Sequence, residues 1–357
     1  FMKNLEMWEN INQLVENANE WSQHENNQKL LGSENDRIQK KIRNSRLRFS
    51  KLEKTQSQKP TLGIYGPSQA GKSYLTSKLG QQIDGALCVN IIKKFDFLKD
   101  INPPGGREST ALVTRFSSNK KSLDTDFPIS AFLLSEADIV CILSNSFKKD
   151  LREAIYPSLE KIMGCLNNLK LNNKEIKDPI DIDSILEIEN YLDSYVFDKE
   201  ISDRFSEVWK FFNKNYKYLD NQNRLTIFSL FWNDLVYFSE LFNSLVTERH
   251  KLGKSIEVQL EQSSLIPRDT SIIDVDVMKK SFLGDQGFGS IKVKNESDET
   301  FEIERWAISA LTEQLSLQLE NPKLSIFKET DLLDFPGARS RIKTDISHSE
   351  KPEQGQL

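Results

Sequence analysis

The chain has 357 residues, a formal net charge of -5 and an isoelectric point near 5.6. This length is enough for two domains or for one domain with a large insertion, and the acidic balance argues against a dedicated nucleic-acid-binding protein. The three cysteines have no C-x-x-C spacing and the three histidines are scattered, which argues against a zinc site and favours a reducing compartment.

The N-terminal segment is predicted to be helical. Residues 3–55 contain no proline and a single glycine, Gly32, and their apolar residues recur at helical spacing, so two helices should break near Gly32. The second helix is strongly basic, which indicates a solvated face, or else a surface for an acidic partner or for lipid headgroups. Its basic residues are Arg37, Lys40, Lys41, Arg43, Arg46, Arg48, Lys51 and Lys54. The N-terminus is polar and acidic, unlike a secretory signal peptide, so we expect a cytoplasmic protein or export by a route without such a signal.

A phosphate-binding loop follows. The run from residue 66 to residue 73 fits the pattern G-x-x-x-x-G-K-[ST], between a predicted short buried strand at residues 61–65 and a predicted helix at residues 73–79. Backbone N–H groups of such a loop, together with the positive end of the helix dipole, face phosphate oxygens. We expect Lys72 to neutralise the β and γ phosphates and the Ser73 hydroxyl to bind Mg²⁺. The predicted nucleotide-binding residues of the loop are Gly66, Pro67, Ser68, Gln69, Ala70, Gly71, Lys72 and Ser73.

Strands are predicted on both sides of a loop downstream. Residues 86–92 should form a strand, and residues 101–107 a loop, because two prolines and two glycines cannot continue a regular element. Residues 111–116 and 127–134 are predicted to form a hairpin around the polar turn 117–126.

Helices are predicted for most of residues 136–262, including a capping box at Ser184 and Glu187. Residues 225–246 are apolar, but a narrow polar stripe favours a deeply buried helix over a membrane span. Residues 271–277 should be extended, and residues 290–294 and 300–304 alternate like a small hairpin.

The last informative run covers residues 330–337. An apolar strand is predicted to deliver Asp334 at its carboxyl end, with Gly337 shortly after it. A carboxylate in that position can hold Mg²⁺, and the glycine N–H can contact a γ-phosphate. A GTPase-like switch also needs a hydroxyl that closes onto Mg²⁺, for which Thr114 or Thr110 could serve. The predicted metal ligands are therefore Ser73, Thr114 and Asp334.

Two arginines lie between these motifs. Arg107 and Arg115 are candidate stabilisers of developing phosphate charge, although surface ion pairs would explain them equally well. With the loop glutamine and the switch hydroxyl, they complete the predicted catalytic set of Gln69, Thr114, Arg107 and Arg115.

These runs carry a family resemblance. Residues 111–115 resemble switch I of dynamin-type GTPases, and residues 333–337 resemble their switch II. The combination of GIYGPSQAGKSYL, INPPGGRESTALVTRF and DLLDFPGARSR is similar to the bacterial virulence factor family called SrfC. The resemblance implies a large P-loop protein that works with companion proteins, and it leaves the substrate open. Ser68 and Gln69 stand in the reverse of the order in dynamin-type loops.

The sequence thus predicts an α/β fold, namely a GTPase-like P-loop NTPase sheet domain with N-terminal helices and a large helical insertion. The predicted parts are an N-terminal helical segment (1–58), the P-loop and switch hairpin (59–145), a helical insertion (146–262) and a return to the nucleotide-binding domain (263–357). Because no guanine-reading [NT]-K-x-D strand follows residue 337, we expect a domain truncated after switch II. The sequence therefore does not decide whether the nucleotide is GTP or ATP.

The expected function is Mg²⁺-dependent hydrolysis of a nucleoside triphosphate, GTP in preference to ATP, by a switch that acts with partner proteins in a bacterial virulence-associated system. The alternatives are a scaffold that holds nucleotide without hydrolysing it and a P-loop kinase, for which residues 103–107 offer too little of an arginine-rich lid. A homodimer across the nucleotide face is a further expectation. Peripheral membrane contact is left open without support in the sequence, and nucleic acid is not expected as a partner.

Overall fold

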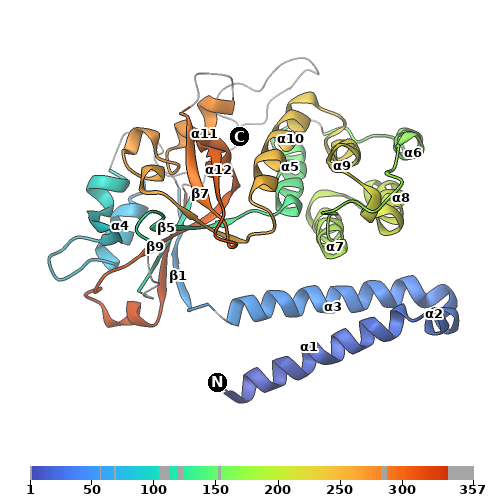
Figure 1. Cartoon of the computed structure of the whole chain (residues 1–357), viewed down its shortest axis with the longest axis horizontal. Coiled ribbons are helices and arrows are strands. Elements are labelled where there is room, and N and C mark those ends of the chain that lie inside the picture. Colours follow the sequence, from blue (N-terminus) through green and yellow to red (C-terminus); the bar gives the residue numbers. More distant parts are fainter. Residues whose placement is uncertain are drawn as a thin grey trace. The chain divides into compact units, whose positions relative to one another are not determined.

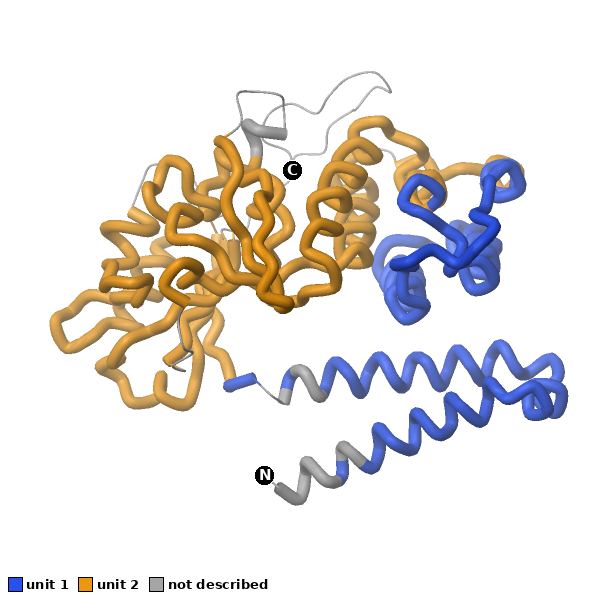
Figure 2. The backbone as a smooth tube through the Cα atoms, viewed as in Figure 1, with its two compact units in different colours: residues 1–59, 162–223 blue, residues 60–161, 224–357 orange. Residues whose placement is uncertain are grey.

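The computed structural model describes residues 2–56, 58–67, 70–103, 112–118, 124–151, 154–282 and 288–336. Two compact units make up the chain: residues 1–59 with residues 162–223, and residues 60–161 with residues 224–357 (Figure 2). The segment 162–223, which lies inside the predicted helical insertion, thus belongs with the N-terminal helices.

The first unit is helical (Figure 1). The predicted break near Gly32 is confirmed, but a second break at His24 divides the segment before it, so the two predicted helices are three. The two long helices, Met2–Gln23 and Asn35–Gln56, pack against each other. The capping box predicted at Ser184 and Glu187 is wrong, because the helix there already begins at Ile182, after Asp181. The helices of this unit are α1 (Met2–Gln23), α2 (Glu25–Leu31), α3 (Asn35–Gln56), most of α6 (Leu159–Asn168), α7 (Ile182–Tyr191) and α8 (Lys199–Asn215).

The basic helix α3 has an acidic partner within the chain. Lys40 donates to Glu189 of α7 at 2.6 Å, and Arg46 and Lys51 form ion pairs with the α7 carboxylates of Asp183 and Glu187. Charged side chains therefore form much of the contact between α3 and α7.

The second unit is built on a mixed sheet. Its described strands run in the order β1 (Thr61–Ile64), β10 (Asp331–Asp334), β4 (Val113–Ser117), β9 (Thr312–Gln318), β5 (Ile129–Leu133), β6 (Glu257–Leu260), β7 (Ser290–Lys294) and β8 (Thr300–Glu304). β1 is parallel to β10 and β4 is parallel to β9, whereas the other neighbours are antiparallel. The predicted β7–β8 hairpin is confirmed. The chain is therefore a mixed α/β protein.

Three predictions about strands are wrong. The hairpin of residues 111–116 and 127–134 does not form, because β9 lies between β4 and β5 and pairs with both. β1 is not a buried strand: it lies at the edge of the described sheet, and only Ile64 at its end is buried. Residues 271–277 are not extended throughout, because α11 (Val275–Phe282) begins among them.

Helices pack around this sheet, with α4 (Lys72–Leu79) against β1 and β10, and α10 (Val236–Lys251) against both α5 (Glu136–Asp150) and α12 (Arg305–Leu311). A small antiparallel pair, β2 (Cys88–Ile91) and β3 (Lys93–Asp96), forms a separate two-stranded sheet that contacts β9, with a bridge between Val89 and Leu319.

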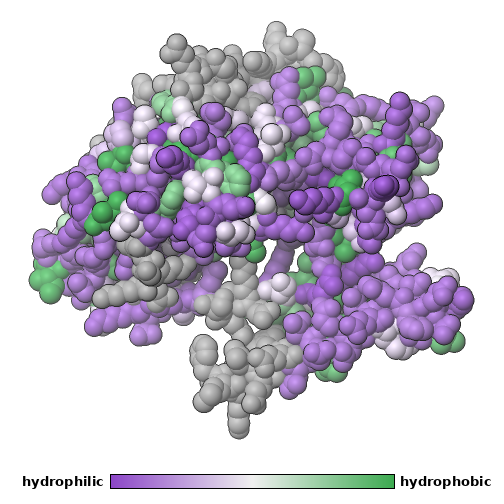
Figure 3. Space-filling view, in the orientation of Figure 1, coloured by the Kyte–Doolittle hydropathy of each residue, from purple (hydrophilic) through white to green (hydrophobic). Residues whose placement is uncertain are grey.

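The apolar segment 225–246 forms two helices rather than one. α9 (Asn221–Phe228) and α10 are separated by a short 3-10 helix, Ser229–Trp232, followed by Asn233 and Asp234, which both have positive φ angles. As predicted, the large apolar side chains of the segment are mostly buried, for example Phe231, Trp232 and Phe242. Within the described part of the chain, every helix is too short or too polar to span a bilayer. The molecular face in Figure 3 is mainly hydrophilic, with hydrophobic residues in small groups.

Candidate functional site

The predicted strand, loop and helix around the phosphate-binding motif are present. β1 ends at Ile64 and α4 begins at Lys72, with Gly66, Pro67, Ala70 and Gly71 of the loop described between them. Gly71 has a φ of 82°, a left-handed conformation that glycine adopts without strain. The Lys72 Nζ donates to the Pro67 carbonyl oxygen at 2.8 Å, so the lysine reaches back across the loop.

The start of α4 is arranged like an anion site. Its first helical hydrogen bond runs from the Leu75 N–H to the Gly71 carbonyl oxygen, at 2.9 Å. The N–H groups before it have no acceptor inside the helix, and the helix dipole is positive at this end. Both features favour a bound phosphate.

Asp334 lies beside this helix start because β10 is the parallel neighbour of β1. The register pairs Asp334 with Ile64, so the two strands end at the same edge of the sheet. The Asp334 side chain is fully buried, and both carboxylate oxygens accept hydrogen bonds from α4: Ser73 Oγ donates to Oδ2 at 2.8 Å and Thr76 Oγ1 donates to Oδ1 at 3.1 Å. Burial raises the pKa of Asp334, and these two hydrogen bonds and the charge of Lys72 oppose the rise.

Thr114 is the third predicted metal ligand. It pairs with Asp334 across the antiparallel β4–β10 ladder, which puts the two side chains on one face of the sheet. Thr114 is fully buried, and its hydroxyl has no hydrogen-bond partner among the described residues. A buried hydroxyl without a partner is unfavourable, so the Thr114 hydroxyl is a candidate contact for a ligand.

These residues fit Mg²⁺. The hydroxyls of Ser73 and Thr114 and the carboxylate of Asp334 are oxygen ligands, which Mg²⁺ prefers, and the ion usually takes one or two carboxylates together with waters and substrate phosphates. Among the described residues no group of three or more His, Cys, Asp or Glu could hold a metal by itself.

Arg115 does not face this site. Its guanidinium pairs with the Asp331 carboxylate at 2.9 Å, and the two side chains are only 11% and 5% exposed. Because neighbouring residues of a strand point to opposite faces, Arg115 lies on the other side of the sheet from Thr114. Of its two interpretations, the ion pair is the one present, although it is buried rather than on the surface.

The remaining predicted site residues lie outside the described residues: Ser68, Gln69, Arg107, Thr110 and Gly337.

Two polar residues of the site are missing from the sequence prediction. Thr76 lies one helical turn after Ser73, a spacing that puts both hydroxyls on one face of α4 and could have revealed it. Asn102 donates from Nδ2 to Ser73 Oγ at 3.3 Å and is almost fully buried. Asn102 belongs to the run INPPGGRESTALVTRF, but nothing in that run singles out its side chain, because its contact with Ser73 depends on how the turn directly before it packs.

An aromatic pair flanks the site. The ring of Phe335, directly after Asp334, lies over Gly63 of β1, where a Cβ atom would approach the ring to 2.9 Å. Tyr65 meets the same ring edge-on, at 6.5 Å between centroids. Gly63 thus allows the close approach that holds Phe335 in place.

The fold and this site define a mixed α/β protein with a candidate phosphate and metal site at the end of two parallel strands. Residues 18–356 match the sequence model of a family described as "Putative bacterial virulence factor", and the chain belongs to this family. No curated protein and no solved structure matches the chain.

Proposed function

We propose that the chain binds a nucleoside triphosphate with Mg²⁺ at the start of α4 and hydrolyses it as a P-loop, GTPase-like switch. The observation that carries the proposal is the 2.8 Å hydrogen bond between Ser73 and Asp334, which joins the phosphate-binding motif to the carboxylate. P-loop nucleotide hydrolases hold Mg²⁺ with a loop hydroxyl and a strand-end aspartate. The dynamin-like pattern of residues 111–115 and 333–337 favours GTP over ATP.

Each described residue of the site has a role in this proposal. The N–H groups at the start of α4 bind phosphate oxygens, and Lys72 exchanges its carbonyl partner for a phosphate. Ser73, Thr114 and Asp334 hold Mg²⁺, which neutralises phosphate charge when it is bound. Thr76 keeps one oxygen of Asp334 occupied and thereby orients the carboxylate.

Hydrolysis would form a bond from a water oxygen to the γ-phosphorus and break the bond from that phosphorus to the β–γ bridging oxygen, with release of phosphate and a nucleoside diphosphate. The predicted role of Gln69 is to orient the attacking water, and that of Arg107 is to stabilise the developing phosphate charge. The predicted role of Gly337 is to contact the γ-phosphate.

A second candidate function is a scaffold that holds nucleotide without appreciable turnover. The observation that favours it is the ion pair of Arg115 with Asp331, which directs one of the two predicted charge stabilisers away from the site. Such charge stabilisation accelerates phosphoryl transfer by several orders of magnitude, so its loss would leave slow hydrolysis.

The cellular setting also stays a proposal. The family description suggests a bacterial virulence-associated system, in which companion proteins would respond to the nucleotide state. A cytoplasmic location and a homodimer across the nucleotide face stay predictions, and peripheral membrane contact stays open.

Nucleotide binding can be measured by fluorescence titration with labelled GTP, ATP and their diphosphates, with Mg²⁺ and with EDTA. We expect Lys72→Ala to weaken triphosphate binding by roughly 10- to 100-fold, as loss of a charged hydrogen bond implies. Lys78→Ala is the matched control, because Lys78 lies on the same helix over the ring of Tyr74 and should not affect binding. Equal affinities for Lys72→Ala and the unmodified chain would refute the proposed site, and phosphate release would separate the hydrolase from the scaffold.

A further inference from the structure

The Ser73 hydroxyl is held from two sides. Its proton is donated to Asp334 Oδ2 at 2.8 Å, and one of its lone pairs accepts from Asn102 Nδ2 at 3.3 Å. Asn102 and Asp334 are 2% and 0% exposed, so water competes little with either contact. A hydroxyl has one proton and two lone pairs, so these two contacts fix the orientation of the Ser73 hydroxyl.

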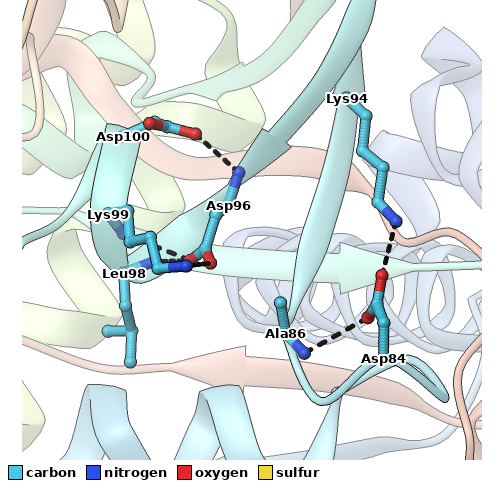
Figure 4. Close-up of polar contacts among 7 residues, drawn as sticks. All are labelled: Asp84, Ala86, Lys94, Asp96, Leu98, Lys99 and Asp100. Carbon is cyan, nitrogen blue, oxygen red and sulfur yellow. Dashed lines mark hydrogen bonds and ion pairs between the residues drawn. The ribbon is translucent and has the colours of Figure 1, made fainter.

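A tight turn fixes the position of Asn102. The π-helical turn Phe97–Ile101 closes when the Asn102 N–H donates to the Phe97 carbonyl oxygen at 2.7 Å. The Asp96 carboxylate accepts from the N–H groups of residues 98 and 99 at 3.0 and 3.2 Å, while the Asp96 N–H donates to Asp100 at 2.8 Å (Figure 4). Hydrogen bonds therefore hold residues 96–102 at both ends of the turn.

The same turn is anchored on the strand that carries Thr114. Phe97 is fully buried and meets Phe116 of β4 edge-on, with 4.8 Å between ring centroids. Phe116 and Thr114 point to the same face of β4, because they are two residues apart. The turn thus packs against β4 near one candidate metal ligand and touches another, Ser73, through Asn102.

We infer that Asn102 is a positioning residue that holds the Ser73 hydroxyl with its proton directed at Asp334 and thereby lowers the affinity of the site for Mg²⁺. This inference rests on the proposed function. Mg²⁺ binds a hydroxyl through its lone pairs, and the amide hydrogens of Asn102 already approach the same oxygen. One lone pair of the Ser73 oxygen is left for the cation, which would lie close to the positive end of the Asn102 N–H dipole, so this hydrogen bond opposes Mg²⁺ binding at that oxygen.

The first test needs no nucleotide. Asn102→Ala, Ser73→Ala and the double variant are compared in the full chain by denaturant unfolding, which gives the coupling between the two side chains. We expect the two changes to be non-additive, by about fivefold in the unfolding constant, as for one ordinary hydrogen bond. Additive effects would overturn the contact between Asn102 and the serine.

The second test titrates Mg²⁺ into the complex with labelled GTP. We expect Asn102→Ala to bind Mg²⁺ about fivefold more tightly while its affinity for the nucleotide in EDTA is unchanged. Asn102→Asp keeps the shape, adds a negative charge and should tighten Mg²⁺ binding further. Asn90→Ala in β2 is the control: it removes an asparagine side chain from the small sheet beside the turn and should leave the affinity for Mg²⁺ unchanged.

The outcomes separate the two proposals. Unchanged or weaker Mg²⁺ binding in Asn102→Ala, with normal nucleotide binding, overturns the inference and leaves the proposed function standing. An unmodified chain that binds no nucleotide overturns the proposed function and the metal part of the inference, while the unfolding cycle still decides whether Asn102 holds Ser73.

Discussion

Replacing Thr76 by valine should destabilise the sheet unit, because Thr76 supplies a hydrogen bond to a buried carboxylate. The Thr76 hydroxyl lies 3.1 Å from Asp334 Oδ1 and 3.0 Å from the Lys72 carbonyl oxygen, and the side chain is fully buried. Valine has nearly the same shape, so no cavity forms. A hydrogen bond to a charged group contributes about 1.5–3 kcal/mol, and we expect a loss of that size at neutral pH.

The loss should depend on pH. Burial raises the pKa of Asp334, and Thr76 opposes that rise, so Thr76→Val should raise the pKa further. For a carboxyl group whose pKa is raised in the folded state, the stabilising form is the protonated one, and its contribution is lost as pH rises through the folded pKa. The difference between the two proteins should therefore be largest when Asp334 is ionised and should shrink as the pH falls below its pKa.

Urea unfolding at several pH values, followed by tryptophan fluorescence, measures this difference. Thr247→Val is the matched control, since Thr247 on α10 also donates to the carbonyl four residues earlier, at 2.7 Å, but is exposed. Thr76→Ser should recover most of the loss. If Thr76→Val were no more destabilising than Thr247→Val, or equally destabilising at all pH values, the hydrogen bond to Asp334 would not be the cause.

Three further predictions concern packing and charge. Gly63→Ala should displace the Phe335 ring and weaken Mg²⁺-dependent nucleotide binding severalfold in the titration above, whereas Gly164→Ala, with open space around it, should not. Glu136→Gln should lower the free energy of unfolding by about 1.5–3 kcal/mol, measured with urea, because it removes the charge from the hydrogen bond that Glu136 accepts from Arg224, which is 1% exposed. Raising the salt concentration from about 0.1 M to 1 M shortens the screening length from roughly 10 Å to 3 Å, so hydrogen exchange should accelerate in α3, whose ion pairs with α7 are partly exposed, and not in β9. Equal exchange in α3 at both salt concentrations would contradict an electrostatic contact.

The sequence predicts those parts of the site whose residues belong to short, contiguous sequence motifs. The strand, loop and helix around Gly71 follow from local preferences, and Ser73 and Asp334 belong to two motifs that function together, which is why their contact across the chain could be anticipated. Asn102 could not be anticipated, because its contact depends on the packing of Phe97 against β4. A pattern of residue types carries no information on such packing.

The sheet order shows the same limit. Residues 111–116 and 127–134 alternate as strands of a hairpin should, and nothing local distinguishes a hairpin from two strands with a third between them. β9 fits between them because Leu315 and Leu317 are buried in the core and because its backbone pairs with both neighbours. The position of a strand from a distant part of the chain is decided by the apolar surface it buries and the backbone hydrogen bonds it forms in the complete sheet, which local sequence does not show.

The pairing of β4 with β10 shapes the site. β4 pairs with β9 on one side and with β10 on the other, and the antiparallel β4–β10 pairing sets Thr114 opposite Asp334. The three candidate Mg²⁺ ligands then come from α4, β4 and β10, which are far apart in the sequence and meet only in the folded sheet. A metal and nucleotide that bind there bind the folded state alone, and at 100 times the dissociation constant they would stabilise it by about 2.7 kcal/mol. We therefore expect ligand-dependent stabilisation of the sheet unit, measured by thermal unfolding with and without Mg²⁺ and nucleotide, to be lost in Asp334→Ala.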